Sequence, residues 1–163
     1  MGIVAGFAFK DIASNAFAGF LLSMQKPFKY GDWIELEDAF GTIQEIGWIT
    51  TSVKTVSGQE VFVPNQLVYS NSFTNYSSFA KRRVILKSGV SYGDDLELVR
   101  RAALEEARQV NGILANEEID FYFTEIGSSS YNFELRFWIK FTHQKDYLQA
   151  MNDIIVRIKS RFE

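Results

Sequence analysis

The sequence contains no cysteine, one histidine and two prolines among its 163 residues. The absence of cysteine excludes a disulfide scaffold, a thiolate metal site and a cysteine nucleophile. Because His143 is the single histidine, a histidine-rich zinc site and a Ser-His-Asp triad are both disfavoured. The chain also lacks a glycine-rich phosphate loop and a recognisable pair of catalytic carboxylates. We therefore predict a protein that is not an enzyme and that holds no metal and no cofactor.

Basic residues are also fewer than acidic ones. Lysine and arginine number 17 against 20 aspartates and glutamates, which gives a net charge of −3. This balance argues against a general nucleic-acid binder, although it is compatible with a local basic patch. Aromatic residues are in excess, with 15 phenylalanines, and the hydrophobic share of 47% is that of a folded protein with one domain or two small ones.

Residues 1–24 differ from the rest of the chain in composition. They carry only two charges, Lys10 and Asp11, and many small residues, and Pro27 follows this stretch. We predict a helix over residues 3–24. No basic region precedes the helix, so a signal peptide is not indicated. The central charged pair argues against a helix surrounded by lipid along its whole length; the small residues favour close helix packing, and a buried helix of a soluble protein is the alternative.

Residues 28–76 contain short runs of β-branched and aromatic residues that are broken by glycines. Ser57 and Gly58 separate two of these runs, which predicts a hairpin because glycine supplies the positive φ of a tight turn. Several short strands at this spacing predict a small all-β barrel. Pro64 ends the second hairpin strand, and we predict that Asn65 caps the short turn that follows.

From residue 83 onward, strands and helices alternate in the predicted order β-α-β-β-α. The clearest strand covers residues 131–141, where the odd-numbered residues are apolar and most even-numbered ones are polar. Asp94 is predicted to cap the first helix of this region. The order is that of a ferredoxin-like α+β unit without its last strand. The predicted elements are a strand over 84–90, a helix over 94–110, strands over 119–124 and 131–141, and a helix from about residue 145.

Several short motifs occur along essentially the whole chain at characteristic spacings. They are Gly6-Phe7-Ala8-Phe9-Lys10-Asp11, Ser14-Asn15-Ala16-Phe17-Ala18-Gly19, Pro27-Phe28-Lys29-Tyr30-Gly31-Asp32, Gly41-Thr42, Gly47 with Thr50-Thr51, Val63-Pro64-Asn65, Leu86 to Tyr92 and Ser128 to Leu135. In combination, these motifs resemble those of the bacterial small-conductance mechanosensitive channel family.

The resemblance implies a homoheptameric channel of the bacterial inner membrane, which membrane tension opens under hypoosmotic stress to release ions and small osmolytes. Its partners would be membrane lipids, permeating ions and further copies of the chain, with no nucleic acid. Residues 1–26 would be the C-terminal part of a pore-lining transmembrane helix and its surface segment. Residues 27–78 would be a β domain with an Sm-like or SH3-like barrel, and residues 79–163 the ferredoxin-like α/β domain, both cytoplasmic. In that family, further membrane helices precede this region and a closing strand follows it.

The resemblance assigns a pore seal to the first helix. Ile3 and Phe7 lie on one helix face because they are four residues apart, and they match the family's hydrophobic seal, which can block ions by dewetting. Leucines are common at these positions in the family, and Phe7 is bulkier. Gly2, Ala5 and Gly6 would pack neighbouring pore helices against one another. A core position in a helical hairpin is the alternative interpretation for Ile3 and Phe7.

The next turns of the helix also match the family. Lys10 and Asp11 would lie where the pore helix bends, and Asp11 departs from the small residue that the family has there. Asn15 would make a polar contact between the helix and the β domain. Phe17 and Phe20 would lie against lipid or the β domain. An adjacent charged pair without a role is the alternative for Lys10 and Asp11.

Two basic groups complete the expected sites. Lys26 and Lys29 follow the apolar segment and would meet anionic lipid headgroups, unless they form a solvated basic turn. Lys81, Arg82 and Arg83 would border the side openings of the cytoplasmic vestibule, where charge biases which ions enter. A solvated linker is the competing interpretation for these three residues, and it is the one that we favour.

The alternative function is a soluble module that binds RNA or acts as an oligomeric scaffold. A small barrel and a ferredoxin-like unit rich in aromatic residues could stack RNA bases. The acidic net charge and the absence of the K/R-G-F-G-F-V-x-F pattern count against RNA binding.

Overall fold

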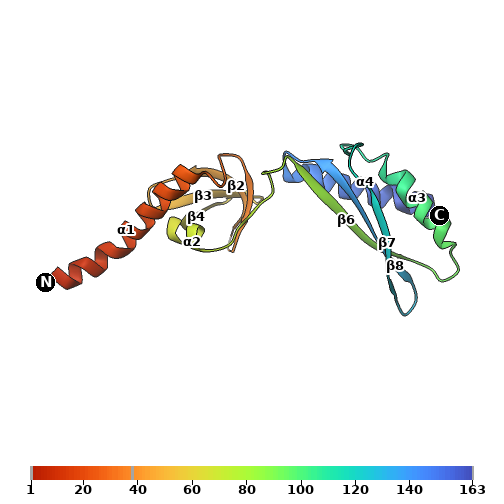
Figure 1. Cartoon of the computed structure of the whole chain (residues 1–163), viewed down its shortest axis with the longest axis horizontal. Coiled ribbons are helices and arrows are strands. Elements are labelled where there is room, and N and C mark those ends of the chain that lie inside the picture. Colours follow the sequence, from red (N-terminus) through yellow and green to blue (C-terminus); the bar gives the residue numbers. More distant parts are fainter. Residues whose placement is uncertain (1, 38, 163) are drawn as a thin grey trace. The chain divides into compact units, whose positions relative to one another are not determined.

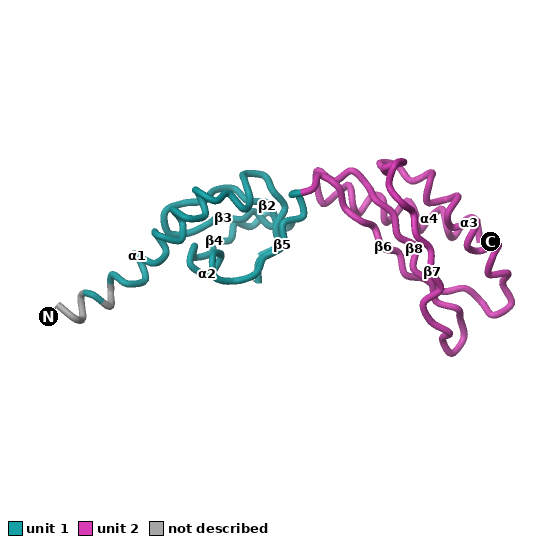
Figure 2. Tube along the Cα trace, in the orientation of Figure 1, with its two compact units in different colours: residues 1–78 teal, residues 79–163 magenta. Residues whose placement is uncertain are grey.

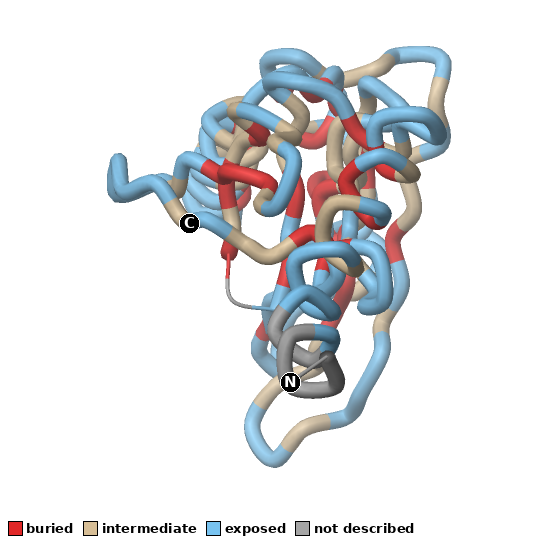
Figure 3. The backbone as a smooth tube through the Cα atoms, turned by 90° about the vertical axis from the view of Figure 1, so that its left-hand side faces the viewer, coloured by how far each residue is buried: buried red, intermediate tan, exposed pale blue. Residues whose placement is uncertain are grey.

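The computed structural model describes residues 2–37 and 39–162, without the side chains of residues 2–5, 7 and 8. The chain forms two compact units, residues 1–78 and 79–163, which are shown in separate colours in Figure 2. Each unit has its own hydrophobic core, whose residues are among those coloured as buried in Figure 3.

The first unit combines a long helix with one antiparallel sheet (Figure 1). Its strands are ordered β4-β3-β2-β1-β5, and β4 and β5 do not pair with each other in the described residues. The hairpin predicted at Ser57 and Gly58 is confirmed, since Gly58 has a φ of 82° between β3 and β4. The elements are α1 (Gly2–Gln25), β1 (Trp33–Leu36), β2 (Ala39–Ile46), β3 (Thr50–Thr55), β4 (Glu60–Pro64), α2 (Asn65–Ser70) and β5 (Thr74–Asn75).

The core of the first unit lies between α1, α2 and the sheet. Leu22 of α1 and Val68 of α2 are buried together with strand residues such as Ile34 and Val53. Phe28, just after α1, is 1% exposed and makes an edge-to-face contact with Phe73. These contacts hold the second half of α1 against its own sheet.

The second unit has the β-α-β-β-α order that the sequence predicts. Its antiparallel strands are ordered β6-β8-β7, and both helices pack on one face of the sheet (Figure 1). The alternation predicted for residues 131–141 is present, because Phe133, Leu135, Phe137 and Ile139 are buried under the helices. The elements are β6 (Lys81–Val90), α3 (Leu96–Ala107), β7 (Asp120–Ile126), β8 (Tyr131–Lys140) and α4 (Gln144–Phe162).

Three local predictions need correction. The first strand of the second unit begins at Lys81 rather than at residue 84, because β6 pairs with β8 along its whole length. Asp95, not Asp94, caps α3: its carboxylate accepts the N–H groups of the second and third helix residues, whereas Asp94 accepts the N–H of Ser91. Asn65 does not cap α2, since its side chain points into the core of the first unit.

Candidate functional site

Helix α1 has two different faces in the part whose side chains are described. Ala18 and Leu22 are buried against the rest of the first unit. The other face carries large apolar side chains that nothing in the unit covers, and they are Phe9, Ile12, Phe17, Phe20 and Met24, each more than half exposed. Exposed apolar surface of this extent is typical of a contact with lipid or with another protein.

Asn15 joins α1 to the start of α2. Its Oδ1 accepts the N–H of Gln66 at 2.9 Å, and its Nδ2 donates to the C=O of Asp11 at 2.9 Å. Gln66 is the second residue of α2, where backbone N–H groups have no partner within the helix. A single amide side chain therefore links the backbone of α1 to the backbone of α2.

A second polar contact lies one turn further along α1, below Gly19. The side chain of Asn65 is fully buried, donates to the C=O of Gly47 at 2.9 Å and accepts from the Thr51 hydroxyl at 2.8 Å. A Cβ on Gly19 would lie 2.4 Å from Asn65 Nδ2 and 2.9 Å from the C=O of Trp48. Only glycine allows this close approach, so the helix rests directly on the turn between β2 and β3.

We call these contacts the helix joint, made by Asn15, Gly19, Thr51, Asn65 and Gln66. Sequence reasoning anticipated only Asn15 as a polar contact. Gly19 and Asn65 were in the motifs, but the buried amide and the close backbone approach depend on residues from three elements. The sequence signal for this close approach was Gly19 itself, because glycine is unfavourable in a helix interior unless packing requires it.

Among the residues expected to form the pore, the structure describes the surroundings of Gly6 alone. The side chains of Ile3, Phe7 and Ala5 lie outside the described residues, as does the surrounding of Gly2. Gly6 is described as exposed, and a Cβ there would contact nothing within 4 Å. Gly6 is therefore not in contact with another element of this single chain.

Lys10 and Asp11 lie within an uninterrupted helix. Helix α1 continues without interruption from Gly2 to Gln25 and includes this pair. Both side chains are exposed. The hydrogen bond from Asn15 to the C=O of Asp11 adds a side-chain bond to the backbone at this point.

Lys26 and Lys29 are both exposed just after α1. Lys26 has a φ of +48°, and its N–H donates to the C=O of Leu22, which ends the helix. The N–H of Lys29 donates to the carboxylate of Asp32 at 3.0 Å, which starts the turn toward β1. The two lysines therefore lie three residues apart in the turn that follows the exposed apolar face.

The Lys81–Arg83 group is divided between two faces of the second sheet. Lys81 pairs with Glu117 at 2.6 Å and Arg83 pairs with Asp120, both on the face away from the helices. Arg82 points to the opposite face, where it donates to Gln144 at 2.6 Å and lies 4.0 Å from the ring centroid of Tyr147. These residues are thus part of a paired strand and not of a solvated linker.

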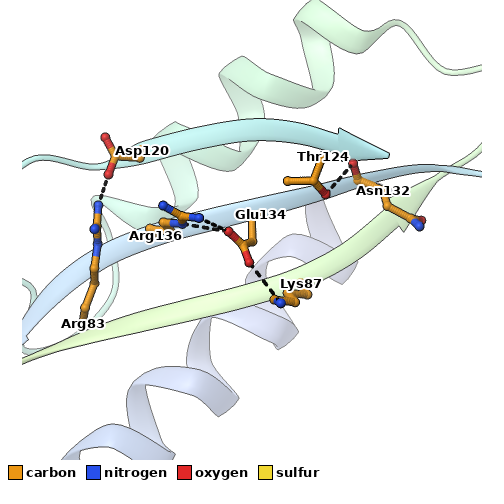
Figure 4. Close-up of polar contacts among 7 residues, drawn as sticks. All are labelled: Arg83, Lys87, Asp120, Thr124, Asn132, Glu134 and Arg136. Atoms are coloured by element: carbon orange, nitrogen blue, oxygen red, sulfur yellow. Dashed lines mark hydrogen bonds and ion pairs between the residues drawn. The ribbon is translucent and has the colours of Figure 1, made fainter. Parts of the chain in front are cut away.

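The same open sheet face carries a second set of ion pairs (Figure 4). Glu134 lies between Arg136, which bonds it through two nitrogens, and Lys87 at 3.2 Å. The hydrogen bonds from Arg136 and Lys87 hold the pKa of the Glu134 carboxyl below its ordinary value, although burial acts in the opposite direction. Glu134 is consequently a carboxylate that stays charged on a mostly covered strand position.

The described residues contain no cluster of three or more histidines or carboxylates that could hold a metal ion. In the same part of the chain, no helix is both long enough and apolar enough to cross a membrane. What the geometry offers is a structural arrangement. A helix with an uncovered apolar face is hydrogen-bonded to α2 through Asn15 and packs through Gly19 on the turn between β2 and β3, and a separate unit carries a charged sheet face.

Two family models match the chain in tandem. The β-domain of the mechanosensitive ion channels matches residues 11–78, and the C-terminal part of the mechanosensitive ion channel MscS matches residues 84–163. The chain belongs to the MscS family of mechanosensitive ion channels. The residues of the helix joint belong to the region that matches the MscS β-domain, and the ion pairs around Glu134 belong to the region that matches the MscS C-terminal part.

Individual MscS relatives agree with this assignment. The low conductance mechanosensitive channel YnaI of Escherichia coli is 32% identical over 161 residues, which are 96% of this chain and 47% of YnaI. A small-conductance mechanosensitive channel of Helicobacter pylori is 31% identical over 163 residues and is covered to 59%. The chain thus spans about half the length of the curated relatives it matches.

Solved MscS structures share the fold. The crystal structure of Helicobacter pylori MscS in its closed state matches with a TM-score of 0.91 at 31% identity, covering 99% of this chain and 63% of that one. A cryo-EM structure of Arabidopsis thaliana MSL1 matches with a TM-score of 0.78 at 21% identity, covering 98% of this chain and 59% of that one. The second likeness shows that the arrangement of elements persists at low sequence identity.

Proposed function

We propose that this chain is the pore-helix and cytoplasmic part of a channel subunit that membrane tension opens to release ions and small osmolytes under hypoosmotic stress. Membership of the MscS family supports the activity, and the uncovered apolar face of α1 supports contact with a bilayer. The bacterial inner membrane is the proposed location, with residues 27–163 on the cytoplasmic side. The apolar face of α1 is the single observation that carries this proposal.

Ile3 and Phe7 form the pore seal in this proposal, and Gly2, Ala5 and Gly6 pack adjacent pore helices. The open space at Gly6 supports that role, because a neighbouring backbone could approach it closely. In the same proposal the pore helix bends at Lys10 and Asp11, which lie within the first half of α1.

Lipid contact is assigned to the uncovered face of α1 and to the turn that follows it. Phe17 and Phe20, both more than 60% exposed, would meet acyl chains or the neighbouring subunit. Lys26 and Lys29 would meet anionic headgroups, since both are exposed directly after the apolar face ends.

The helix joint would transmit movement of the pore helix to the β domain. Asn15 carries this role, because its amide bonds the backbone of α1 and the backbone of α2 at the same time. Gating that separates α1 from the sheet would have to break these bonds and uncover the buried amide of Asn65.

The two cytoplasmic modules are proposed to be an Sm-like barrel and a ferredoxin-like unit without its last strand. The strand orders β4-β3-β2-β1-β5 and β6-β8-β7 support these folds. Seven copies would surround the pore, and Lys81, Arg82 and Arg83 would border side openings of the resulting vestibule. The ion pairs of Lys81 and Arg83 would then fix the local charge there.

The seal assignment is tested by patch recordings of the full-length protein. Phe7→Ser should lower the tension needed for opening, because a polar side chain hydrates the collar. Phe9→Ser is the matched control, since Phe9 is two residues away on a different helix face and is 68% exposed. An unchanged threshold in Phe7→Ser, or an equal drop in Phe9→Ser, would remove Phe7 from the seal.

Assembly is tested separately by the mass of the detergent-extracted full-length protein. A mass of seven subunits supports the proposed ring, and a monomer favours a soluble module. Binding of single-stranded RNA at low salt is the additional outcome that would replace the channel by an RNA-binding function.

A further inference from the structure

Lys10 lies on the helix face that the proposed function places toward the pore. Helix α1 is continuous through this position, so the helical repeat can be followed from residue 3 onward. Lys10 is seven residues after Ile3 and three after Phe7, which places it within about 20° of the first and about 60° of the second around the helix axis. It comes one turn after Phe7, toward the β domain.

Asp11 belongs to a different stripe of the same helix. The residues four, seven and eleven positions after Asp11 are Asn15, Ala18 and Leu22, which contact α2 or are buried in the unit. Lys10 lies about 100° away from this stripe around the helix axis, and its side chain is exposed. The two adjacent charges therefore diverge: Asp11 lies toward its own unit and Lys10 lies on an uncovered side.

Lys10 also has no acidic partner on its helix. The positions three and four residues away are occupied by Gly6, Phe7, Ala13 and Ser14, so no carboxylate lies where a helical ion pair would form. No ion pair of Lys10 is present among the described residues, and its side chain is exposed. Its charge is therefore not neutralised within this part of the chain.

We infer that Lys10 forms a ring of positive charge directly inside the seal, and that this ring favours permeation of small anions over cations. The inference rests on the proposed function, because only a ring of copies turns one lysine into a collar. Rings of like charge in a narrow pore raise the local concentration of counter-ions and set the preferred sign of the permeating ion. The preference for anions follows because the exposed charge of Lys10 has no ion-pair partner on its helix among the described residues.

The test is the reversal potential of tension-activated currents in a KCl gradient, recorded with the full-length protein. Lys10→Gln should lower the chloride-to-potassium permeability ratio by about twofold or more, and Lys10→Glu should lower it further. Lys10→Arg should retain the wild-type ratio because it keeps the charge. Lys145→Gln, an equal charge change at an exposed residue of α4, is the control and should leave the ratio unchanged.

The outcomes separate this inference from the proposed function. Tension-activated currents with the same permeability ratio in the wild type, Lys10→Gln and Lys10→Glu would overturn the lysine ring and leave the channel intact. A Lys10→Arg variant that loses the preference would also contradict a charge effect. The absence of any tension-activated current in the wild type would overturn both.

Discussion

The two units of this chain use polar residues in opposite ways. In the first unit, neutral amides and a hydroxyl are buried between a helix and a sheet, with Asn65 and Thr51 both at 0% exposure. In the second unit, charged residues pair across an open sheet face, and Lys87 keeps 78% of its side chain exposed. The first arrangement excludes water from both partners, whereas in the second the mostly covered Glu134 is paired with Lys87 and Arg136, which remain in contact with water.

This difference predicts which changes alter the stability of each unit. A buried neutral group loses its whole hydrogen-bond energy when its partner is removed, because no water replaces the bond. Exposed ion pairs are screened by solvent and contribute little individually. The helix joint should therefore respond strongly to single substitutions, and the charged face should respond mainly to pH and salt.

The largest effect is expected for Asn65→Ala. This change leaves the C=O of Gly47 and the hydroxyl of Thr51 without their buried partner, which should cost about 3 kcal/mol of unfolding free energy in the first unit. Hydrogen exchange of the β3 and β4 amides measures this loss. Asn71→Ala is the control, because Asn71 is exposed and its bond to Glu37 is long, so a change within about 0.5 kcal/mol is expected. Equal losses in both variants would contradict a special role for burial.

Gly19→Ala is expected to have the next largest effect. Alanine normally stabilises a helix relative to glycine by up to about 1 kcal/mol, but here its Cβ would overlap Asn65 and the C=O of Trp48. Overpacking should reverse the sign and destabilise the first unit by about 1 to 2 kcal/mol. Gly6→Ala carries the same change where nothing lies within 4 Å, and it should cause no loss. The comparison fails if hydrogen exchange shows Gly19→Ala to be as stable as Gly6→Ala.

The smallest effect is expected on the charged face, and it depends on pH. Because the folded-state pKa of Glu134 lies below its unfolded value, its contribution is complete above the ordinary glutamate range and is lost as pH falls through the lowered pKa. Glu134→Gln should therefore make the second unit less stable at neutral pH and make its stability fall less steeply on acidification. Urea unfolding of the wild type and the variant at several pH values measures the stability at neutral pH and its dependence on pH.

Glu118→Gln is the control for that prediction, since Glu118 is an exposed carboxylate on the loop before β7. It should keep the wild-type dependence on pH. If Glu134→Gln and Glu118→Gln give the same slope, the ion pairs of Glu134 contribute nothing specific.

The sequence predicts local elements better than contacts between them. The strand at residues 131–141 and the hairpin at Gly58 follow from alternation and turn chemistry, which act over a few residues. Asn65 was misassigned because an asparagine before a short helix usually caps it, and the competing partners, Gly47 and Thr51, come from distant positions. Its role depends on tertiary packing, which no local pattern contains.

The prediction for the basic residues 81–83 was wrong for a related reason. Lys81 and Arg83 were expected in a linker because consecutive basic residues favour solvent. They lie in β6 instead, where Glu117 and Asp120 pair with them and both cationic groups lie over the ring of Trp138. Ion pairs that join residues 36 or 37 positions apart are not visible in a linear sequence.

The most direct test of the central proposal is the recording of currents from the full-length protein in liposome patches under controlled suction. Stepwise currents that appear with rising membrane tension and close when it is released are the predicted result. A protein that inserts into the liposomes and yet gives no tension-dependent current would contradict the proposed channel activity.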